Sequence, residues 1–175
     1  RYPEALYNFE TFLSCLDQLN SNTKHLILLP LTSNANLEKI VSLLISHKLF
    51  KDKSKNFSLG QEAIWTKGKI SLLLGLGTFN SWVKFPDVAL CNAGTATEQI
   101  VGLGIPSLSL PGKGPQFTKS FAKRQQRLLG GSVQVCNTKK KLIERLNILL
   151  QNKKARYEQS KIGMSRMGTS GGSEK

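Results

Sequence analysis

Short apolar runs alternate with segments of helical periodicity along most of this 175-residue chain. Strands rich in apolar residues are expected at residues 25–30, 70–74, 87–91, 107–110 and 132–136. Each run is about as long as a β-strand and far shorter than the ~20 apolar residues of a membrane-spanning helix. Mostly apolar strands, such as the unbroken run at 25–30, are typical of a parallel sheet that helices cover on both faces. The alternation therefore predicts an α/β fold with a doubly wound, Rossmann-like parallel sheet.

Helices are expected between these strands, where apolar residues recur at spacings of three and four. Asn34 is the expected N-cap of the second helix. The charged connection 51–68 is expected to hold a short edge strand at 63–66. We expect one Rossmann-like domain over residues 1–168 and a flexible tail at 169–175. The expected helices span residues 4–19, 34–49, 79–84, 95–103, 116–129, 138–151 and 153–167.

The chain starts directly at its first helix, although a doubly wound sheet begins with a strand. Its first residue is Arg1 and not a methionine, and no signal peptide is visible. We therefore expect a fragment of a larger protein, with a strand and its following loop upstream of Arg1.

The chain is strongly basic, with 25 Lys and Arg against 11 Asp and Glu and a net charge of +14. The lysine runs at 51–55, 139–141 and 153–156 fall in loops or at helix ends, where a solvated surface is the simplest interpretation. Attraction to an anionic membrane surface is the next alternative. Nucleic acid is the least favoured partner, because no zinc finger, helix-turn-helix or RNP-type aromatic motif is present.

Cysteine and histidine patterns argue against a metal site. Cys15, Cys91 and Cys136 are far apart and odd in number, so neither a disulfide framework nor a zinc site is expected. The two histidines, His25 and His47, cannot form a histidine-based site alone. We expect no metal and a reducing, cytoplasmic location.

The loop at residues 92–98 follows a strand and opens a helix. Small residues there let a ligand approach the backbone, and free amides at a helix start favour phosphate. The threonines add hydroxyl donors, and Glu98 can accept hydrogen bonds from sugar hydroxyls. A plain helix start without a ligand is the alternative. The residues expected to face a phosphate group are Gly94, Thr95, Ala96 and Thr97.

Two further strand-to-helix loops share this glycine-rich character. In the loop at 111–116, Lys113 can pair with a diphosphate and Gln116 can bind hydroxyls, although a tight turn explains the glycines equally well. Gly75, Gly77 and Thr78 could form the floor under a flat base, and a helix-capping turn is the alternative. Neither GxxxxGK[ST] nor GxGxxG occurs. No catalytic triad or carboxylate pair is visible, so the catalytic residues remain unknown.

The run at residues 87–106 resembles the nucleotide-sugar half of GT-B glycosyltransferases, and most closely the lipid-A-disaccharide synthase-related group. Residues 110–118 and 124–129 fit that group, as do residues 166–173. Residues 1–8 are similar to the segment directly after its Pro-Gly-Ser-Arg loop. The resemblance covers most of the chain, and residues 87–129 are its specific part.

The resemblance implies that this chain is the C-terminal, donor-binding domain of a two-domain transferase, whose missing N-terminal Rossmann-like domain carries most acceptor and catalytic groups. The substrate would be a UDP-sugar and the acceptor a lipid or membrane-proximal molecule at the inner membrane face. The fragment alone would bind without turnover, and no metal or other cofactor is expected. The implied roles are diphosphate binding by Gly94, Thr95, Ala96, Thr97, Lys113 and Arg1, and ribose or sugar binding by Glu98 and Gln116.

One position departs from the family pattern. In lipid-A-disaccharide synthases the acid stands one residue later, where this chain has Gln99. This departure leaves the ribose role of Glu98 and the identity of the sugar open. Two alternative functions also stay open: an enzyme like the non-hydrolysing UDP-N-acetylglucosamine 2-epimerases, and a non-catalytic nucleotide- or RNA-binding module.

Overall fold

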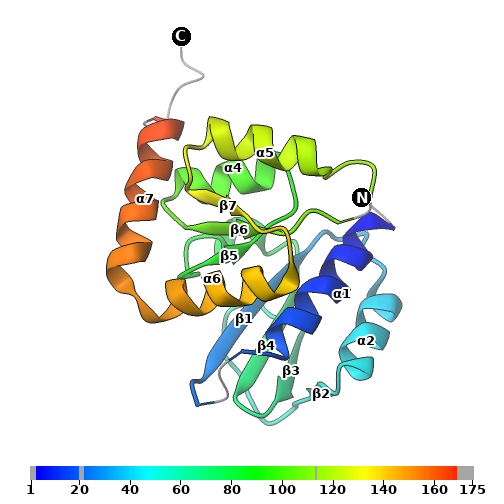
Figure 1. Ribbon diagram of the computed structural model, residues 1–175. Coiled ribbons are helices and arrows are strands. Elements are labelled where there is room, and N and C mark those ends of the chain that lie inside the picture. The colour runs from blue at the N-terminus through cyan, green and yellow to red at the C-terminus, as the bar shows by residue number, and fades with distance from the viewer. Residues whose placement is uncertain (1–2, 20–21, 113, 169–175) are drawn as a thin grey trace. The chain divides into compact units, whose positions relative to one another are not determined.

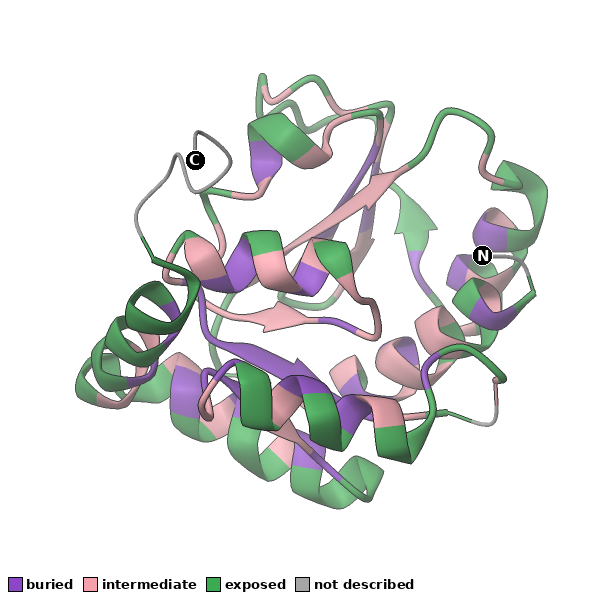
Figure 2. Ribbon diagram, turned by 90° about the horizontal axis from the view of Figure 1, so that it is seen from above, coloured by how far each residue is buried: buried purple, intermediate pink, exposed green. Residues whose placement is uncertain are grey.

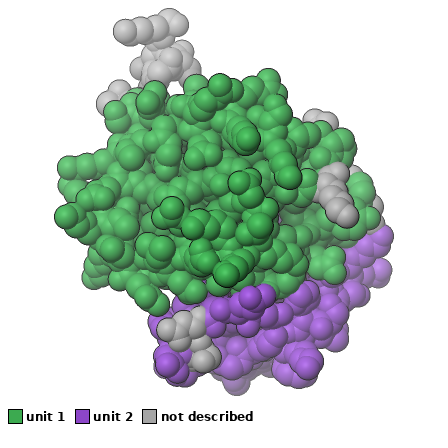
Figure 3. Space-filling view, in the orientation of Figure 1, with its two compact units in different colours: residues 1–15, 86–175 green, residues 16–85 purple. Residues whose placement is uncertain are grey.

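The computed structural model describes residues 3–19, 22–112 and 114–168. The chain divides into two compact units, which Figure 3 shows in two colours. Unit 1 consists of residues 1–15 and 86–175, and unit 2 of residues 16–85. Each unit has its own sheet and its own core cluster. The expected tail at 169–175 lies outside the described residues.

Unit 1 contains a three-stranded parallel sheet in the order β5-β6-β7. Helices cover both of its faces: α4 and α6 contact β6, and α5 contacts β7 (Figure 1). α1 (Glu4–Leu16) begins in this unit. The other elements are β5 (Ala89–Leu90), α4 (Thr95–Gly102), β6 (Ser107–Ser109), α5 (Lys119–Leu128), β7 (Val133–Val135), α6 (Lys139–Gln151) and α7 (Lys153–Met167).

The core of unit 1 lies between the sheet and its helices. Val101 of α4, Val133 of β7 and Leu129 after α5 form one buried cluster. Leu108 of β6 and Leu142 of α6 are fully buried as well. Figure 2 shows how buried and exposed residues alternate along the helices. The α/β class with a parallel sheet, expected from the apolar runs, is confirmed for this unit.

Unit 2 contains a four-stranded sheet in the order β1-β4-β3-β2. β1 and β4 are parallel, whereas β3 is antiparallel to both β4 and β2. Ile64, Leu73 and Trp82 form the centre of its core, and the Trp82 indole donates a hydrogen bond to the Leu59 carbonyl at 2.7 Å. The elements are β1 (His25–Leu31), α2 (Leu37–Ser46), β2 (Phe50–Lys51), β3 (Ala63–Lys67), β4 (Ile70–Leu76) and α3 (Phe79–Trp82).

The expectation of one wholly parallel sheet needs correction, because the described strands form two sheets and one of them is mixed. Only Gly68 and Lys69 separate β3 from β4. A two-residue turn joins antiparallel strands, whereas a parallel pair needs a crossover of a dozen or more residues. Gly68 stands at the first turn position with φ of 55°, which suits glycine. The expected strand at 63–66 exists, but β2 and not β3 is the edge strand.

Two local expectations are also corrected. β1 is not buried on both faces: Leu26 is 49% exposed, because β1 is the outer strand on its side of the described sheet. The N-cap of α2 is Asn36 and not Asn34, since the Asn36 side chain accepts a hydrogen bond from the Lys39 amide at 3.0 Å.

α5 begins at Lys119 and not at residue 116. Thr118 is its N-cap, and the Thr118 hydroxyl accepts from the Phe121 amide at 3.2 Å. The longest described helix, α7, has 15 residues. Among the described residues, no helix combines the length and the apolar character that crossing a bilayer requires.

Candidate functional site

The start of α4 presents free backbone amides. Its N-cap is Gly94, whose carbonyl accepts from the amides of Thr97 at 3.0 Å and Glu98 at 3.2 Å. Gly94 has no side chain with which to cap the helix. Among the described residues, no acceptor binds the amides of Thr95 and Ala96. Amides left open at a helix start, together with the helix dipole, form a local anion-binding group.

The four residues expected to face a phosphate do not all point outward. Thr95 is exposed, and Gly94 and Ala96 are half-buried. Thr97 is fully buried, and its hydroxyl donates to the Ala93 carbonyl at 2.7 Å. The Thr97 hydroxyl and amide are therefore both engaged within the protein, and the donors without an acceptor among the described residues are the amides of Thr95 and Ala96.

Glu98 lies in the first turn of α4 and is half-buried. Its carboxylate forms no ion pair with the described cations. An acid in this position stabilises the helix through the dipole, which accounts for its presence without a ligand. A carboxylate with open acceptor positions can also hold a sugar hydroxyl.

The side chain of Asn92, in the loop after β5, forms hydrogen bonds to the backbone of the loop after β6. Its Oδ1 accepts from the Leu110 amide at 3.0 Å, and its Nδ2 donates to the Leu110 carbonyl at 2.7 Å. The same Nδ2 donates to Oδ1 of Asn8 in α1 at 3.1 Å. This amide side chain continues the hydrogen bonding of the two parallel strands past their carboxyl ends.

Glu4, in the first turn of α1, binds the C-terminal end of the loop after β6. It is only 8% exposed, and its two carboxylate oxygens accept from the amides of Gln116 at 3.1 Å and Phe117 at 2.9 Å. Charged acceptors on backbone amides form stronger hydrogen bonds than neutral acceptors do. The sequence indicated only a favourable helix-start charge at Glu4, and its partners lie more than a hundred residues away.

The glycines of the loop 111–116 make room for these α1 side chains. A Cβ on Gly114 would overlap the Glu4 carboxylate, and a Cβ on Gly112 would lie 3.0 Å from Asn8 Oδ1. Glycine is required at position 114 for this close approach, independently of any ligand. Gln116 is exposed, with its backbone held by Glu4. Lys113 and Arg1, the two expected phosphate-binding cations, lie outside the described residues.

Gln125 of α5 is a functional candidate that the sequence did not reveal. It is 4% exposed, and its Nε2 donates to the carbonyls of Ala93 at 3.0 Å and Gly94 at 3.2 Å. Its buried Oε1 has no partner in the described part of the chain. Gln125 thus holds the backbone directly before α4 and fixes the direction of the helix start.

The residues expected to lie under a base, Gly75, Gly77 and Thr78, belong to unit 2, whereas 94–98 and Gln116 belong to unit 1. Gly75 is buried, and a Cβ there would lie 2.5 Å from the Trp82 ring. Gly77 has φ of 65°, and its amide donates to the Leu31 carbonyl at 2.7 Å. Packing of Trp82 and turn geometry explain both glycines within unit 2.

Cys91, shortly before the start of α4, is a titratable residue with a shifted pKa. Burial raises the pKa of the Cys91 thiol to about 12, and hydrogen bonds to Ser107 and Thr97 only partly oppose this. Cys91 is therefore a neutral, inert core residue at physiological pH. Within residues 3–19, 22–112 and 114–168, no group of three or more His, Cys, Asp or Glu side chains could hold a metal ion.

The arrangement at the carboxyl end of the parallel sheet can bind an anion and adjacent hydroxyl groups. Open amides, a half-exposed carboxylate and an exposed amide side chain supply the donors and acceptors, and Glu4, Asn92 and Gln125 hold the loops.

A comparison of the chain with models of known protein families found no match, and neither did a comparison with curated protein sequences.

Proposed function

We propose that this chain is the donor-binding domain of a GT-B glycosyltransferase similar to the lipid-A-disaccharide synthases. The start of α4 would hold the diphosphate of a UDP-sugar, and Glu98 and Gln116 would bind ribose or sugar hydroxyls. Hexosyl transfer to a lipid or membrane-proximal acceptor would need a second Rossmann-like domain. The proposal rests on the sequence resemblance over residues 87–129 and on the open amides of Thr95 and Ala96.

The position of these amides is the observation that carries the proposal. Parallel α/β sheets bind ligands at the carboxyl ends of their strands, and α4 starts shortly after β5 ends. The loop is held from behind by Gln125 and Asn92, so its amides need no rearrangement before binding. Pre-organised donors lower the free-energy cost of binding. Helix amides facing the diphosphate would also stabilise its negative charge as it departs.

The sharpest test removes one amide donor without removing the helix. Proline suits the first position of a helix, so Thr95→Pro deletes an open N–H and keeps α4. Loss of a hydrogen bond to a charged group costs about 2 kcal/mol, so calorimetry should show UDP affinity falling roughly thirtyfold. Lys153→Pro makes the same change at the first position of α7 and should leave UDP affinity unchanged.

The role of Glu98 has its own test. Glu98→Gln should weaken UDP and UDP-sugars about tenfold, because a neutral amide oxygen is a weaker acceptor for a ribose hydroxyl. Glu158→Gln removes the same charge from an exposed position of α7 and serves as the matched control. If UDP affinity is unchanged in both variants, the ribose role of Glu98 is wrong. If the chain binds no UDP compound but binds RNA with strong salt dependence, the whole proposal is wrong.

A further inference from the structure

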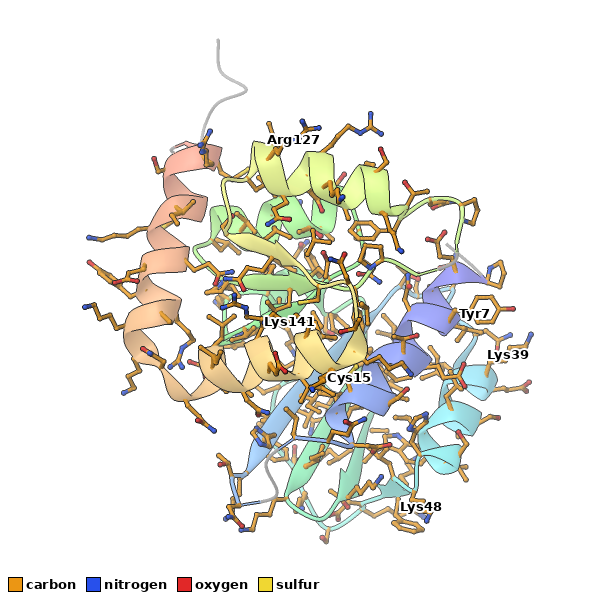
Figure 4. The ribbon with its side chains drawn as sticks, in the orientation of Figure 1. Tyr7, Cys15, Lys39, Lys48, Arg127 and Lys141 are labelled. Carbon is orange, nitrogen blue, oxygen red and sulfur yellow. The ribbon has the colours of Figure 1, made fainter. Side chains whose placement is uncertain are left out.

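α5 is a basic helix without an acidic residue. All of its cations are exposed, whereas Ala122 and Gln125 on its inner side are buried. None of these cations forms an ion pair with a described carboxylate. Figure 4 shows Arg127 projecting from the outer side of the helix. The four cations of α5 are Lys119, Lys123, Arg124 and Arg127.

A further cation lies beside this helix. An open depression at the end of α5 is lined by Lys123, Gln126, Arg127, Gly130 and Gly131. A Cβ on Gly130 would lie 2.7 Å from Nε of Arg166 and 3.1 Å from Cγ2 of Ile162. The last turns of α7 therefore pack against the turn after α5. The exposed Arg166 lies against Gly130, which lines the same depression as Lys123 and Arg127.

Large apolar side chains are exposed beside these cations. Leu128, in the last turn of α5, is 64% exposed, and Ile162 of α7 is 41% exposed. Cations flanked by exposed aliphatic side chains are typical of surfaces that lie in a membrane interface, where aliphatic groups leave water and cations meet headgroup phosphates. We call Lys119, Lys123, Arg124, Arg127, Leu128, Ile162 and Arg166 the α5–α7 basic face.

Neither helix capping nor nucleic-acid binding accounts for the whole of this face. The helix dipole favours a cation in the last turn, which explains Arg127 but not the three earlier cations. Single-stranded nucleic acid is usually bound by stacking on exposed aromatic rings. The aromatic residue of α5, Phe121, is half-buried and packs edge-on against Phe117, with ring centroids 5.5 Å apart. The exposed leucine and isoleucine favour a lipid surface over RNA.

We propose that the α5–α7 basic face docks on an anionic lipid bilayer. Its lysines and arginines contact headgroup phosphates, and Leu128 and Ile162 enter the interface. This inference does not depend on nucleotide binding, because no residue of the face belongs to the start of α4. The net positive charge of the chain suggests an anionic partner in general, and this proposal names the surface that binds it.

Vesicle sedimentation tests the proposal with the whole chain. Vesicles of phosphatidylglycerol and phosphatidylcholine in equal parts should bind the chain, and pure phosphatidylcholine vesicles should not. The triple variant Lys123→Gln, Arg124→Gln, Arg127→Gln should bind the anionic vesicles about a hundredfold more weakly, at roughly fivefold for each cation near the surface. Leu128→Ser should weaken binding about tenfold with no change of charge.

A matched control distinguishes the effect of this face on vesicle binding from the effect of the net charge of the chain. The triple variant Lys51→Gln, Lys53→Gln, Lys55→Gln removes the same charge from exposed positions of unit 2 and should bind almost like the parent chain. Circular dichroism would verify the fold of each variant, and Leu128→Ser alone decides the test if the α5 triple variant unfolds. Equal losses in both triple variants, displacement by inorganic phosphate at matched ionic strength, or tighter binding of single-stranded RNA through the same residues would each overturn the proposal.

Discussion

Unit 1 and unit 2 use their polar side chains differently. In unit 1, buried side chains bind backbone groups of loops: Glu4 binds two amides, and Gln125 binds two carbonyls. In unit 2, the main polar cluster consists of Asp17, His47 and Lys67 and lies partly exposed. Parallel strands leave long loops at one edge that need such support, whereas the β3–β4 hairpin closes through its own ladder bonds. The difference indicates that buried side chains, more than ladder hydrogen bonds, hold the loops of unit 1 at the carboxyl ends of its strands.

Glu4→Ala should have the largest effect on stability. It leaves the buried amide of Phe117 and the partly buried amide of Gln116 without their acceptor, which we expect to cost about 3 kcal/mol of unfolding free energy. Urea unfolding followed by circular dichroism measures this. Glu10→Ala changes an exposed acid of the same helix and should cost less than about 0.5 kcal/mol. Equal, small effects of both variants would mean that the buried carboxylate does not support the loop.

Gly75→Ala should have the next largest effect, in unit 2. The new Cβ would meet the Trp82 ring and the Thr78 side chain within 2.7 Å, and such overpacking costs about 2 kcal/mol. Gly77→Ala meets nothing within 4 Å but needs φ of 65°, so about 1 kcal/mol is expected. Both tryptophans of the chain, Trp65 and Trp82, lie in unit 2, so urea unfolding followed by their fluorescence reads this unit. A larger loss for Gly77→Ala would contradict the packing role of Gly75.

Asp17→Asn should have the smallest effect. Lys67 Nζ lies 2.6 Å from Asp17 Oδ1, and His47 Nδ1 lies 2.9 Å from Oδ2. Burial would raise the pKa of Asp17, but hydrogen bonds from Lys67 and His47 outweigh burial and hold this pKa below its ordinary value. The partly exposed cluster should contribute about 1 kcal/mol at neutral pH.

The sign of the pH dependence follows from the lowered pKa of Asp17. Its stabilising contribution is present above the pKa of about 3.9 in the unfolded chain and is lost as the pH falls through the lower folded pKa. The stability difference between the parent chain and Asp17→Asn should therefore shrink toward zero in acid. Tryptophan fluorescence during urea unfolding at several pH values measures it. A difference that stays constant would show that Asp17 does not titrate with the cluster.

The sequence predicted the parts of this fold that depend on local pattern. Apolar runs located β1, β4, β6 and β7, because burial requires such runs whatever their partners. Gly94, which follows β5, located the start of α4 because glycine is one of the residues found at helix N-caps. The hairpin at Gly68 was missed although a two-residue turn beginning with glycine is a recognisable signal.

The contacts that hold the candidate site could not be predicted in this way. Glu4 meets Gln116 and Phe117 across 112 and 113 residues of sequence, and Asn8 meets Asn92 across 84. A side chain's partner depends on how distant segments pack, and an isolated glutamate in a first helical turn has an adequate local explanation. The burial of Thr97 was missed for the same reason, since its outward or inward direction depends on the packing of α4.

The proposed function depends above all on diphosphate binding by the open amides of Thr95 and Ala96. Nuclear magnetic resonance of the nitrogen-15-labelled chain during titration with UDP observes these two amides individually. We predict saturable shifts of their proton resonances toward lower field, larger than those of any amide in unit 2, as hydrogen bonds to phosphate form. Saturable UDP binding that leaves the Thr95 and Ala96 resonances unmoved would show that the diphosphate binds elsewhere.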